Sequence, residues 1–217
     1  MKNCCNLSSG PIAEHFDVNA AESELKRYIE KGPNPTTRSL LAHIISSGTG
    51  TTLLDIGAGI GAASFELLAA GYTEAVCIDI SPAYTAVTRK EIIKRGLENR
   101  MKMIEGDFAE SNESVPNSDT VVMDRVVCCY PLFRPLLESA LQRSQRLFAY
   151  SYPHDRWYIR LVFAIENLLR KIRGEEFRTF VHSKREMERI ITSAGFRKLK
   201  HARTLVWSID LFHRVTT

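Results

Sequence analysis

The chain has 217 residues, 44% of them hydrophobic and 25% charged, which excludes a disordered, collagenous or coiled-coil protein and predicts one globular domain. Its net charge of +4 conceals a split. Residues 1–133 carry 12 Lys and Arg against 17 Asp and Glu, whereas residues 134–217 carry 17 against 8. A basic second part suits the binding of nucleic acid or of acidic substrates.

The five cysteines predict a reducing, cytoplasmic location, because they form two adjacent pairs and one single residue without zinc-site spacing. Cys77, Cys128 and Cys129 adjoin apolar runs and are expected to pack. Cys4 and Cys5 lie in residues 1–18, which are expected to be loose. No apolar run approaches the ~18 residues of a membrane span, and no signal peptide or metal site is recognisable.

Two helices are expected first, at 19–31 with Asn19 as its cap and at 37–47, separated by a Gly-Pro-Asn-Pro break. Strands and helices then alternate. The expected strands are 52–56, 75–80, 101–105, 120–124 and 147–150. The expected helices between them are 60–70, 82–95 and 131–143. Helices at 156–173 and 183–194 follow, and then strands at 196–201 and 204–212.

This alternation predicts an α/β fold with a doubly wound, mostly parallel seven-stranded sheet and helices on both faces. The last two strands are close enough to form an antiparallel hairpin at the C-terminal edge. Residues 1–48 are expected to be a tail and a short helical cover. Residues 49–217 are expected to be the core of a single domain.

The clearest site signal is a strand that runs into Gly57-Ala58-Gly59-Ile60-Gly61 and then into a helix. Glycines let a ligand approach the backbone, and a helix start presents free N–H groups. The loop also satisfies the dinucleotide fingerprint, because Ala62 follows at the required spacing. Asp79 ends the next strand and suits a ribose diol in either case. An NAD- or FAD-binding oxidoreductase therefore stays open at this point.

Three acidic positions favour a different ligand. Asp55 lies two residues before Gly57, where it would repel a pyrophosphate but tolerate a sulfonium ligand with an amino group. Asp107 and Phe108 follow the third strand, and an acid beside an aromatic ring suits an adenine. Asp124 ends the fourth strand at the same edge of the sheet.

Over about residues 50–150 this pattern resembles class I S-adenosylmethionine-dependent methyltransferases. The carrying motifs are strand–D-x-G-x-G-x-G, an acid ending the second strand, and Gly106-Asp107-Phe108 after the third. The resemblance implies S-adenosylmethionine as cofactor, with the loop at its methionine part, Asp79 at the ribose and Asp107 at the adenine. The cofactor-binding residues expected on this basis are Asp55, Gly57, Ala58, Gly59, Gly61, Asp79, Ile80, Asp107, Phe108 and Asp124.

The implied reaction is an in-line displacement at the methyl carbon, in which positioning supplies much of the catalysis and a general base is optional. The segment after Asp124 lacks the N/D-P-P-Y/F signature of amino-methylating enzymes and a Pro-Cys nucleophile. No nucleic-acid partner is therefore expected. The expected acceptor is the O or N atom of an acidic or hydrophobic small molecule.

The candidate catalytic residues are His154, as a general base past the fifth strand, together with Asp124 and Tyr130. His154 could equally be a turn residue. Tyr28 and Lys31 on the first helix are candidates for contacting the cofactor or closing the pocket.

The helix at 156–173 carries an apolar stripe that predicts a core face. The stripe comprises Tyr158, Leu161, Val162, Ile165, Leu168, Leu169 and Ile172. Trp157, Ile159 and Phe163 fall off it, so the helix is expected to bury a wider face, to form a lid over a hydrophobic substrate, or to form an interface. A non-catalytic protein with the same fold stays open, and the sequence does not indicate an oligomeric state.

Overall fold

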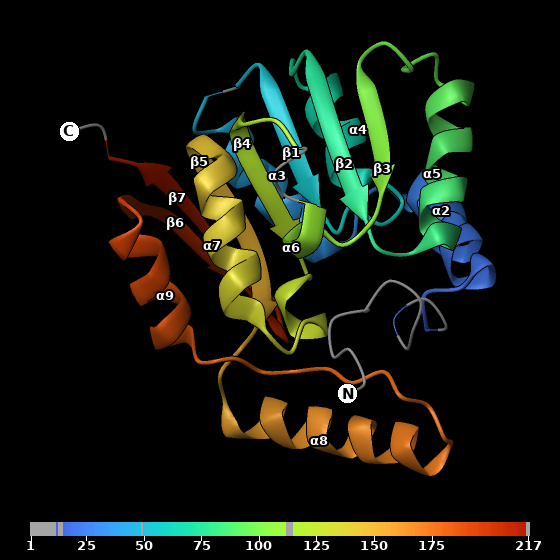
Figure 1. The fold of residues 1–217 in the computed structure, drawn as a ribbon, viewed down its shortest axis with the longest axis vertical. Coiled ribbons are helices and arrows are strands. Elements are labelled where there is room, and N and C mark those ends of the chain that lie inside the picture. Colours follow the sequence, from blue (N-terminus) through green and yellow to red (C-terminus); the bar gives the residue numbers. More distant parts are fainter. Residues whose placement is uncertain (1–11, 13–14, 49, 112–114, 216–217) are drawn as a thin grey trace.

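The structure is a computed structural model that describes residues 12, 15–48, 50–111 and 115–215. Cys4 and Cys5 lie outside the described residues. Seven strands form one sheet in the order β3-β2-β1-β4-β5-β7-β6 (Figure 1). The strands are β1 Thr52–Ile56, β2 Glu74–Asp79, β3 Met101–Glu105, β4 Ser118–Asp124, β5 Ser144–Pro153, β6 Phe196–Arg203 and β7 Trp207–Arg214.

Helices precede, connect and follow these strands. They are α2 Val18–Lys31, α3 Pro35–Ile45, α4 Ala62–Ala69, α5 Pro82–Lys94, α6 Phe108–Ser111, the 3-10 turn η2 Val127–Cys129, α7 Phe133–Arg143, α8 Trp157–Ile172 and α9 Lys184–Ser193. The predicted α/β class and the antiparallel C-terminal hairpin are confirmed. Since β7 lies between β5 and β6, the edge strand is β6.

The five strands β1 to β5 are parallel, and β7 pairs antiparallel with β5 and β6. The carboxyl ends of the parallel strands therefore meet at one edge, which is where α/β sheets bind ligands. β5 extends well beyond the predicted 147–150, because β7 pairs with it from Leu147 to Pro153. A ten-residue strand consequently continues the sheet past that edge.

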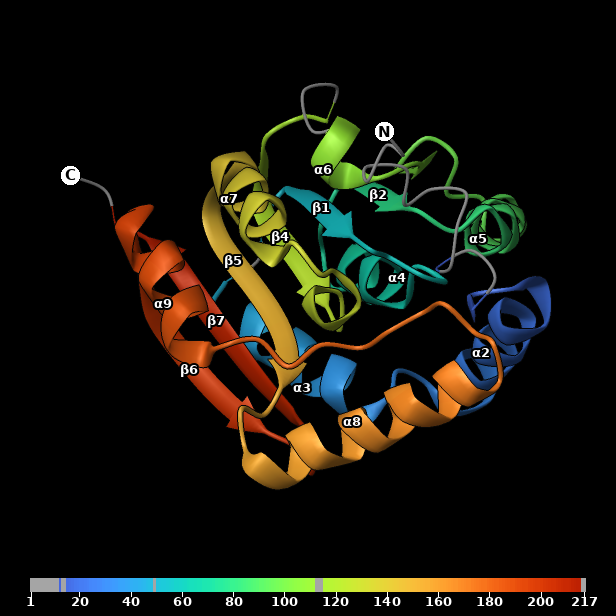
Figure 2. The same cartoon turned by 60° about the horizontal axis from the view of Figure 1, so that its bottom comes forward.

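Two apolar layers cover the sheet. α3 and α4 pack on one face and α7 and α9 on the other (Figure 2). Leu40 and Ile44 of α3 are fully buried in the first layer with Phe65 of α4. The second layer joins Leu137 of α7 to Ile191 of α9. α3 therefore belongs to the packed core of the sheet as well as covering it.

Local chemistry explains the helix starts. Asp17, not the expected Asn19, caps α2 by accepting a hydrogen bond from the backbone of Ala20 at 2.8 Å. Asn34 caps α3 ahead of Pro35, so this helix begins two residues earlier than predicted. The expectation that residues 1–18 are loose is wrong for Ile12, which is buried. It is also wrong for Phe16, whose ring centroid lies 5.5 Å from that of Phe177.

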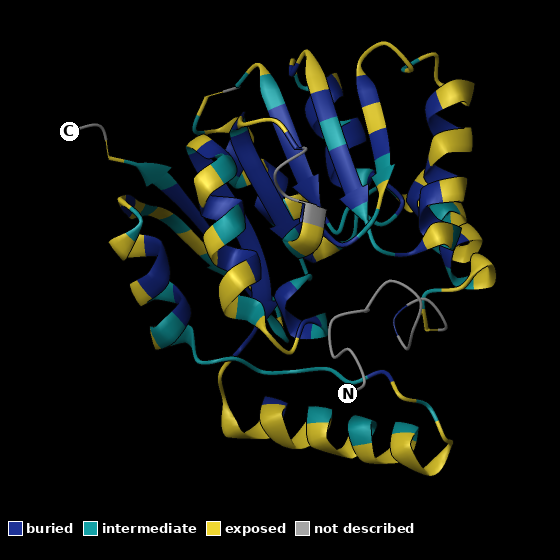
Figure 3. Cartoon of the chain, viewed as in Figure 1, coloured by how far each residue is buried: buried dark blue, intermediate teal, exposed yellow. Residues whose placement is uncertain are grey.

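α8 lies apart from both layers and crosses the carboxyl ends of the strands (Figures 1 and 2). Figure 3 shows that most of its surface is exposed. The predicted core stripe is wrong, because all seven of its residues are exposed. Instead, Ile159 is buried and Phe163 is half-buried, on the opposite side of the helix.

Candidate functional site

A cavity of about 740 Å³ lies between the carboxyl ends of the strands and α8. Its glycine-loop end is lined by residues 57–60 and by the four carboxylates Asp55, Asp79, Asp107 and Asp124. Its α8 end is lined by residues of α8, of the segment 177–179 and of the β6–β7 turn. Four carboxylates from four strand ends thus share one cavity, as the sequence predicts.

The glycine loop needs its first glycine for steric reasons. Gly57 has φ +65° and donates a backbone hydrogen bond to Ile78 O at 2.8 Å. A Cβ atom at Gly57 would lie 2.5 Å from the Val126 side chain. The loop backbone therefore lies directly against β2 and the β4–α7 loop, and Ala58 and Gly59 line the cavity.

Gly61 has a different role from the one expected. It is absent from the cavity lining, and a Cβ there would lie 2.7 Å from the Met101 side chain and 3.1 Å from that of Thr88. Its small size therefore serves the packing of α4 against α5 and β3. Lys31 also lies outside the lining, whereas Tyr28 is part of it.

The Asp79 carboxylate is held by the backbone. Gly59 N donates to Asp79 Oδ2 at 2.8 Å, and Ser81 N donates to Oδ1 at 2.8 Å. Burial raises the pKa of Asp79 above its ordinary value. Each carboxylate oxygen keeps a second lone pair, so Asp79 can still accept hydrogen bonds from a ligand diol. Ile80 lines the cavity beside it.

Asp55 is fully enclosed at the end of β1. Ser64 Oγ donates to Asp55 Oδ2 at 2.8 Å. Burial, with the nearby charges of Asp124 and Asp79, raises the pKa of Asp55 from 3.8 to about 7. A ligand cation in the cavity would favour the ionised form of this carboxyl group.

Asp107 and Tyr130 form a pair in the cavity wall. The Tyr130 hydroxyl donates to Asp107 Oδ2, and Ala109 N donates to Oδ1 at 2.9 Å. Phe108 is buried beside them and also lines the cavity. This contact makes Tyr130 an anchor for Asp107, and the structure gives no support to the catalytic role expected for it.

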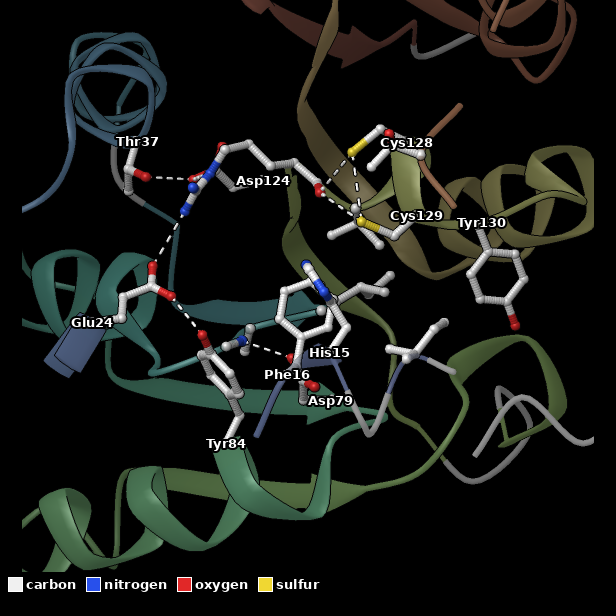
Figure 4. A pocket seen from close by; sticks show the side chains of 18 of the residues that line it. His15, Phe16, Glu24, Thr37, Asp79, Tyr84, Asp124, Cys128, Cys129 and Tyr130 are labelled. Atoms are coloured by element: carbon white, nitrogen blue, oxygen red, sulfur yellow. Dashed lines mark hydrogen bonds and ion pairs between the residues drawn. The ribbon is translucent and has the colours of Figure 1, made fainter. Parts of the chain in front are cut away.

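Asp124 accepts hydrogen bonds from two hydroxyl groups. Thr37 Oγ1 donates to its Oδ2 (Figure 4). Ser151 Oγ donates to its Oδ1 at 2.5 Å. The Arg125 guanidinium lies 3.6 Å away. With both oxygens engaged in this way, Asp124 links α3 to β5 and positions Arg125.

A second chain of contacts joins α2 to this site. Arg125 Nη2 lies 3.5 Å from Glu24 Oε1, and the Tyr84 hydroxyl donates to Glu24 Oε2 at 2.9 Å (Figure 4). Arg125 has φ +62°, the one positive φ among the described non-glycine residues. Its buried Nε atom has no hydrogen-bond partner among the described residues. The Arg125 guanidinium, ion-paired with Asp124 and Glu24, also lines the cavity, where a cation is suited to an anionic ligand group.

Sequence reasoning missed Glu24 and Tyr84, and it missed the contact of Thr37 with Asp124. The partners Tyr84 and Glu24 are 60 residues apart, and Thr37 and Asp124 are 87 apart. No local motif signals such contacts. The expected role of Tyr28 and Lys31 at the pocket is the one hint that the first helix contacts the site.

His154 is not at the cavity, which corrects its expected role as a general base. Its Nδ1 lies 2.8 Å from Ser208 Oγ and its Nε2 lies 3.0 Å from Thr204 O. A carbonyl oxygen only accepts, so Nε2 donates to Thr204 O. The two ring nitrogens thus contact the β6–β7 turn at Thr204 and β7 at Ser208, and His154 is absent from the cavity lining.

Other titratable groups in the lining are poor bases. The Tyr28 hydroxyl donates to Glu66 at 2.9 Å, and burial raises the pKa of Tyr28 to about 12. Cys128 and Cys129 lie with their sulfur atoms 3.6 Å apart. Cys128 has a raised pKa because of its contact with Cys129 and its burial, and a raised pKa disfavours a thiolate nucleophile.

The α8 end of the cavity is apolar and aromatic. The contributing apolar residues are Tyr158, Ile159, Val162, Phe163, Leu205, Val206 and Trp207. His15 stacks on Phe177 with ring centroids 4.2 Å apart, and both line the cavity. The chain segment before α2 therefore helps to close this end.

Comparison with known proteins identifies the fold. Residues 53–149 match a family model described as a methyltransferase domain. No curated protein matches the chain. Magnesium protoporphyrin IX methyltransferase from Synechocystis with bound S-adenosylhomocysteine is 18% identical, with a TM-score of 0.74 over 94% of this chain and 98% of that one.

Two further solved structures show how varied the proteins with this fold are. Human N-acetylserotonin methyltransferase in complex with S-adenosylmethionine is 17% identical, with a TM-score of 0.66 over 92% of this chain and 56% of that one. A putative RNA methyltransferase from Pyrococcus horikoshii is 18% identical, with a TM-score of 0.59 over 85% of this chain and 84% of that one.

Within the described residues, no helix combines the length and apolar character that crossing a bilayer requires. The same residues contain no cluster of three or more His, Cys, Asp or Glu side chains arranged to hold a metal ion. The domain match and the order of the strands displace the oxidoreductase interpretation of the glycine loop. Residues 53–149 therefore match a methyltransferase domain, and the chain has the fold of class I methyltransferases.

Proposed function

We propose that the chain transfers the methyl group of S-adenosylmethionine to an O or N atom of a small molecule with an apolar body. The observation that carries this proposal is the shape and lining of the cavity. Its volume of about 740 Å³ lies within the range of small-molecule sites. One end is polar and acidic, and the other is apolar and closed by α8.

The glycine-loop end fits the cofactor. Gly57 to Gly59 would cradle the methionine part, near the Asp55 carboxylate that tolerates its ammonium group. The ribose hydroxyls would meet Asp79 and Ile80, and the adenine would meet Asp107 and Phe108. The Arg125 guanidinium, which lines the cavity, supports a place nearby for the methionine carboxylate.

Catalysis in this proposal rests on placing the acceptor in line with the sulfonium. S-adenosylmethionine supplies an activated methyl group, and the cavity excludes water from the reacting atoms. Asp124 contributes by holding Arg125 and α3 in place. No side chain is assigned as a dedicated general base, and the acceptor's proton is released to solvent.

The proposal also places the chain in the cytoplasm. The described cysteines Cys77, Cys128 and Cys129 are free thiols, which suits a reducing compartment. Nucleic acid is not the proposed acceptor, because the α8 end of the cavity offers mostly apolar surface where a nucleic-acid backbone requires cationic groups.

Incubation of the purified chain with radiolabelled S-adenosylmethionine and a metabolite extract tests the proposal. We expect label to appear in a small product that partitions into organic solvent. Label found only in added RNA or in protein would contradict the assignment of the acceptor, and so would the absence of any labelled product when the cofactor binds.

A further inference from the structure

The outer face of α8 is an apolar surface that no part of the described chain covers. Eight apolar side chains on this face are between 37% and 76% exposed. They are Trp157, Tyr158, Leu161, Val162, Ile165, Leu168, Leu169 and Ile172, of which Tyr158 and Val162 lie at the edge of the face and also line the cavity. Exposed residues of this kind are ordinary when scattered, but a contiguous apolar face on one helix marks an interaction surface.

The helix is amphipathic, and its apolar face points outward. Leu161, Ile165 and Leu168 follow the i, i+4, i+7 spacing that places side chains on one helix face. The half-buried residues Phe163 and Arg170 lie on the other face, toward the cavity. In a helix that served only as a lid, the apolar face would point inward. In α8, the larger apolar face has no internal partner.

Charge around the apolar face selects the partner. Residues 156–173 carry five Lys and Arg and one acidic residue, Glu166, or +4. Asp155 lies 2.8 Å from Arg160, and Glu175 lies 4.0 Å from Arg173. Arg156 and Lys171 have no acidic partner among the described residues. Glu166 faces the cavity lining, so no acidic residue interrupts the apolar face.

A second copy of the chain is a poorer partner for this face. A helix of 16 residues is about 24 Å long and about 10 Å wide, which is too small for the ~800 Å² per partner of a standard interface. Two copies would also bring their basic flanks together. An anionic lipid surface matches both features, because it accepts apolar side chains and attracts lysine and arginine.

We infer that α8 docks the chain on the surface of an anionic membrane, with its apolar face in the boundary between headgroups and acyl chains. Trp157 and Tyr158 lie at one end of the helix, and aromatic rings of this kind favour that boundary. The inner face of α8 lines the cavity. Docking would therefore bring the apolar end of the cavity to the bilayer, from which a lipophilic acceptor could enter.

Vesicle co-sedimentation of the full chain tests this inference. The probes are phosphatidylcholine vesicles and phosphatidylcholine vesicles containing phosphatidylglycerol. We expect at least about tenfold more binding to the anionic vesicles, with weaker binding at high salt, because the basic flanks contribute to it. Equal binding to both compositions, or none to either, would overturn the inference.

Matched variants identify the surface. L161E/I165E/L168E places three charges on the apolar face, at residues that do not line the cavity, and should lower vesicle binding at least about tenfold. V18E/I93E/L132E changes three residues elsewhere that are 51% to 67% exposed, and should bind vesicles about as the unaltered chain does. Equal losses in both variants would contradict a role for α8.

Two further measurements separate the alternatives. Sedimentation velocity without vesicles should give a monomer for every variant. A dimer that L161E/I165E/L168E dissociates would show that a second copy covers the face. Titration with S-adenosylhomocysteine should give the same affinity for both triple variants. If L161E/I165E/L168E loses membrane binding but keeps its cofactor affinity, the role of α8 at the membrane is tested separately from the proposed function.

Discussion

The two ends of the cavity are built from different parts of the chain. The glycine-loop end comes from residues at the ends of neighbouring strands between Asp55 and Asp124, and it holds four carboxylates. The α8 end comes from Ile12, His15 and Phe16 and from the distant segments 158–179 and 205–207, and it is mostly apolar. In the proposed function, cofactor and acceptor would thus meet different chemistry within one cavity, and variants at one end should leave the function of the other intact.

The largest expected effect is at the glycine loop. Gly57→Ala should weaken S-adenosylhomocysteine binding more than about 100-fold, because the new Cβ would lie 2.5 Å from the Val126 side chain and displace the loop. Isothermal titration measures this affinity.

Gly96→Ala is the matched control. Gly96 also has φ +65°, but nothing lies within 4 Å of its Cβ position. This variant should lose about 1 kcal/mol of stability and no cofactor affinity. An equal loss of affinity in both variants would show that cofactor binding depends on the left-handed backbone and not on contact with the Val126 side chain.

Asp55→Asn separates cofactor binding from stability at the polar end. The pKa of Asp55 is raised to about 7, so the folded chain binds a proton that the unfolded chain releases from about pH 4 upward. Stability is therefore lost as pH rises toward 7. At about pH 8 the free energy of unfolding of the variant should exceed that of the unaltered chain by about 2 kcal/mol. At about pH 4 this difference should vanish.

The same variant should bind S-adenosylmethionine about tenfold more weakly, because the ionised carboxylate is lost. Asp119→Asn is the control, for which the opposite change in stability is expected. Hydrogen bonds from Thr51 lower the pKa of Asp119, so its ionised form stabilises the fold and the substitution should destabilise it at about pH 8. Chemical denaturation across the pH range measures both. A destabilised Asp55→Asn protein at about pH 8 would contradict the account.

A smaller effect is expected at the α8 end. Phe163→Ser should raise the KM for an apolar acceptor about fivefold, by removing apolar surface from the cavity, and leave the KM for S-adenosylmethionine unchanged. Leu168→Ser, on the outer face of the same helix, should change neither in a vesicle-free assay. A rise in the cofactor KM of Phe163→Ser would show that the two ends are not separate.

The sequence was informative where short-range patterns decide structure. Alternating apolar runs predicted the seven strands, and the motifs at Gly57, Asp79 and Asp107 predicted residues that do meet in one cavity. Those motifs lie at strand ends, and parallel strands bring such ends together without further information.

Prediction failed where contacts between residues far apart in the sequence determine the structure. Nothing near Glu24 signals Arg125, 101 residues away. His154 follows a strand end as a catalytic base would, but Ser208 of β7 and Thr204 of the β6–β7 turn engage its two nitrogens. The apolar stripe of α8 predicted a core, because helical periodicity shows that a face is apolar and not what covers it.

Calorimetric titration with S-adenosylhomocysteine tests the central claim, that the glycine-loop end of the cavity binds the adenosyl cofactor. The account predicts saturable binding of one molecule per chain with micromolar affinity, competition by S-adenosylmethionine, and no heat with NAD. It also predicts that Asp79→Ala abolishes the signal while Asp119→Ala retains it. Absence of binding by the unaltered chain, or undiminished binding by Asp79→Ala, would contradict the account.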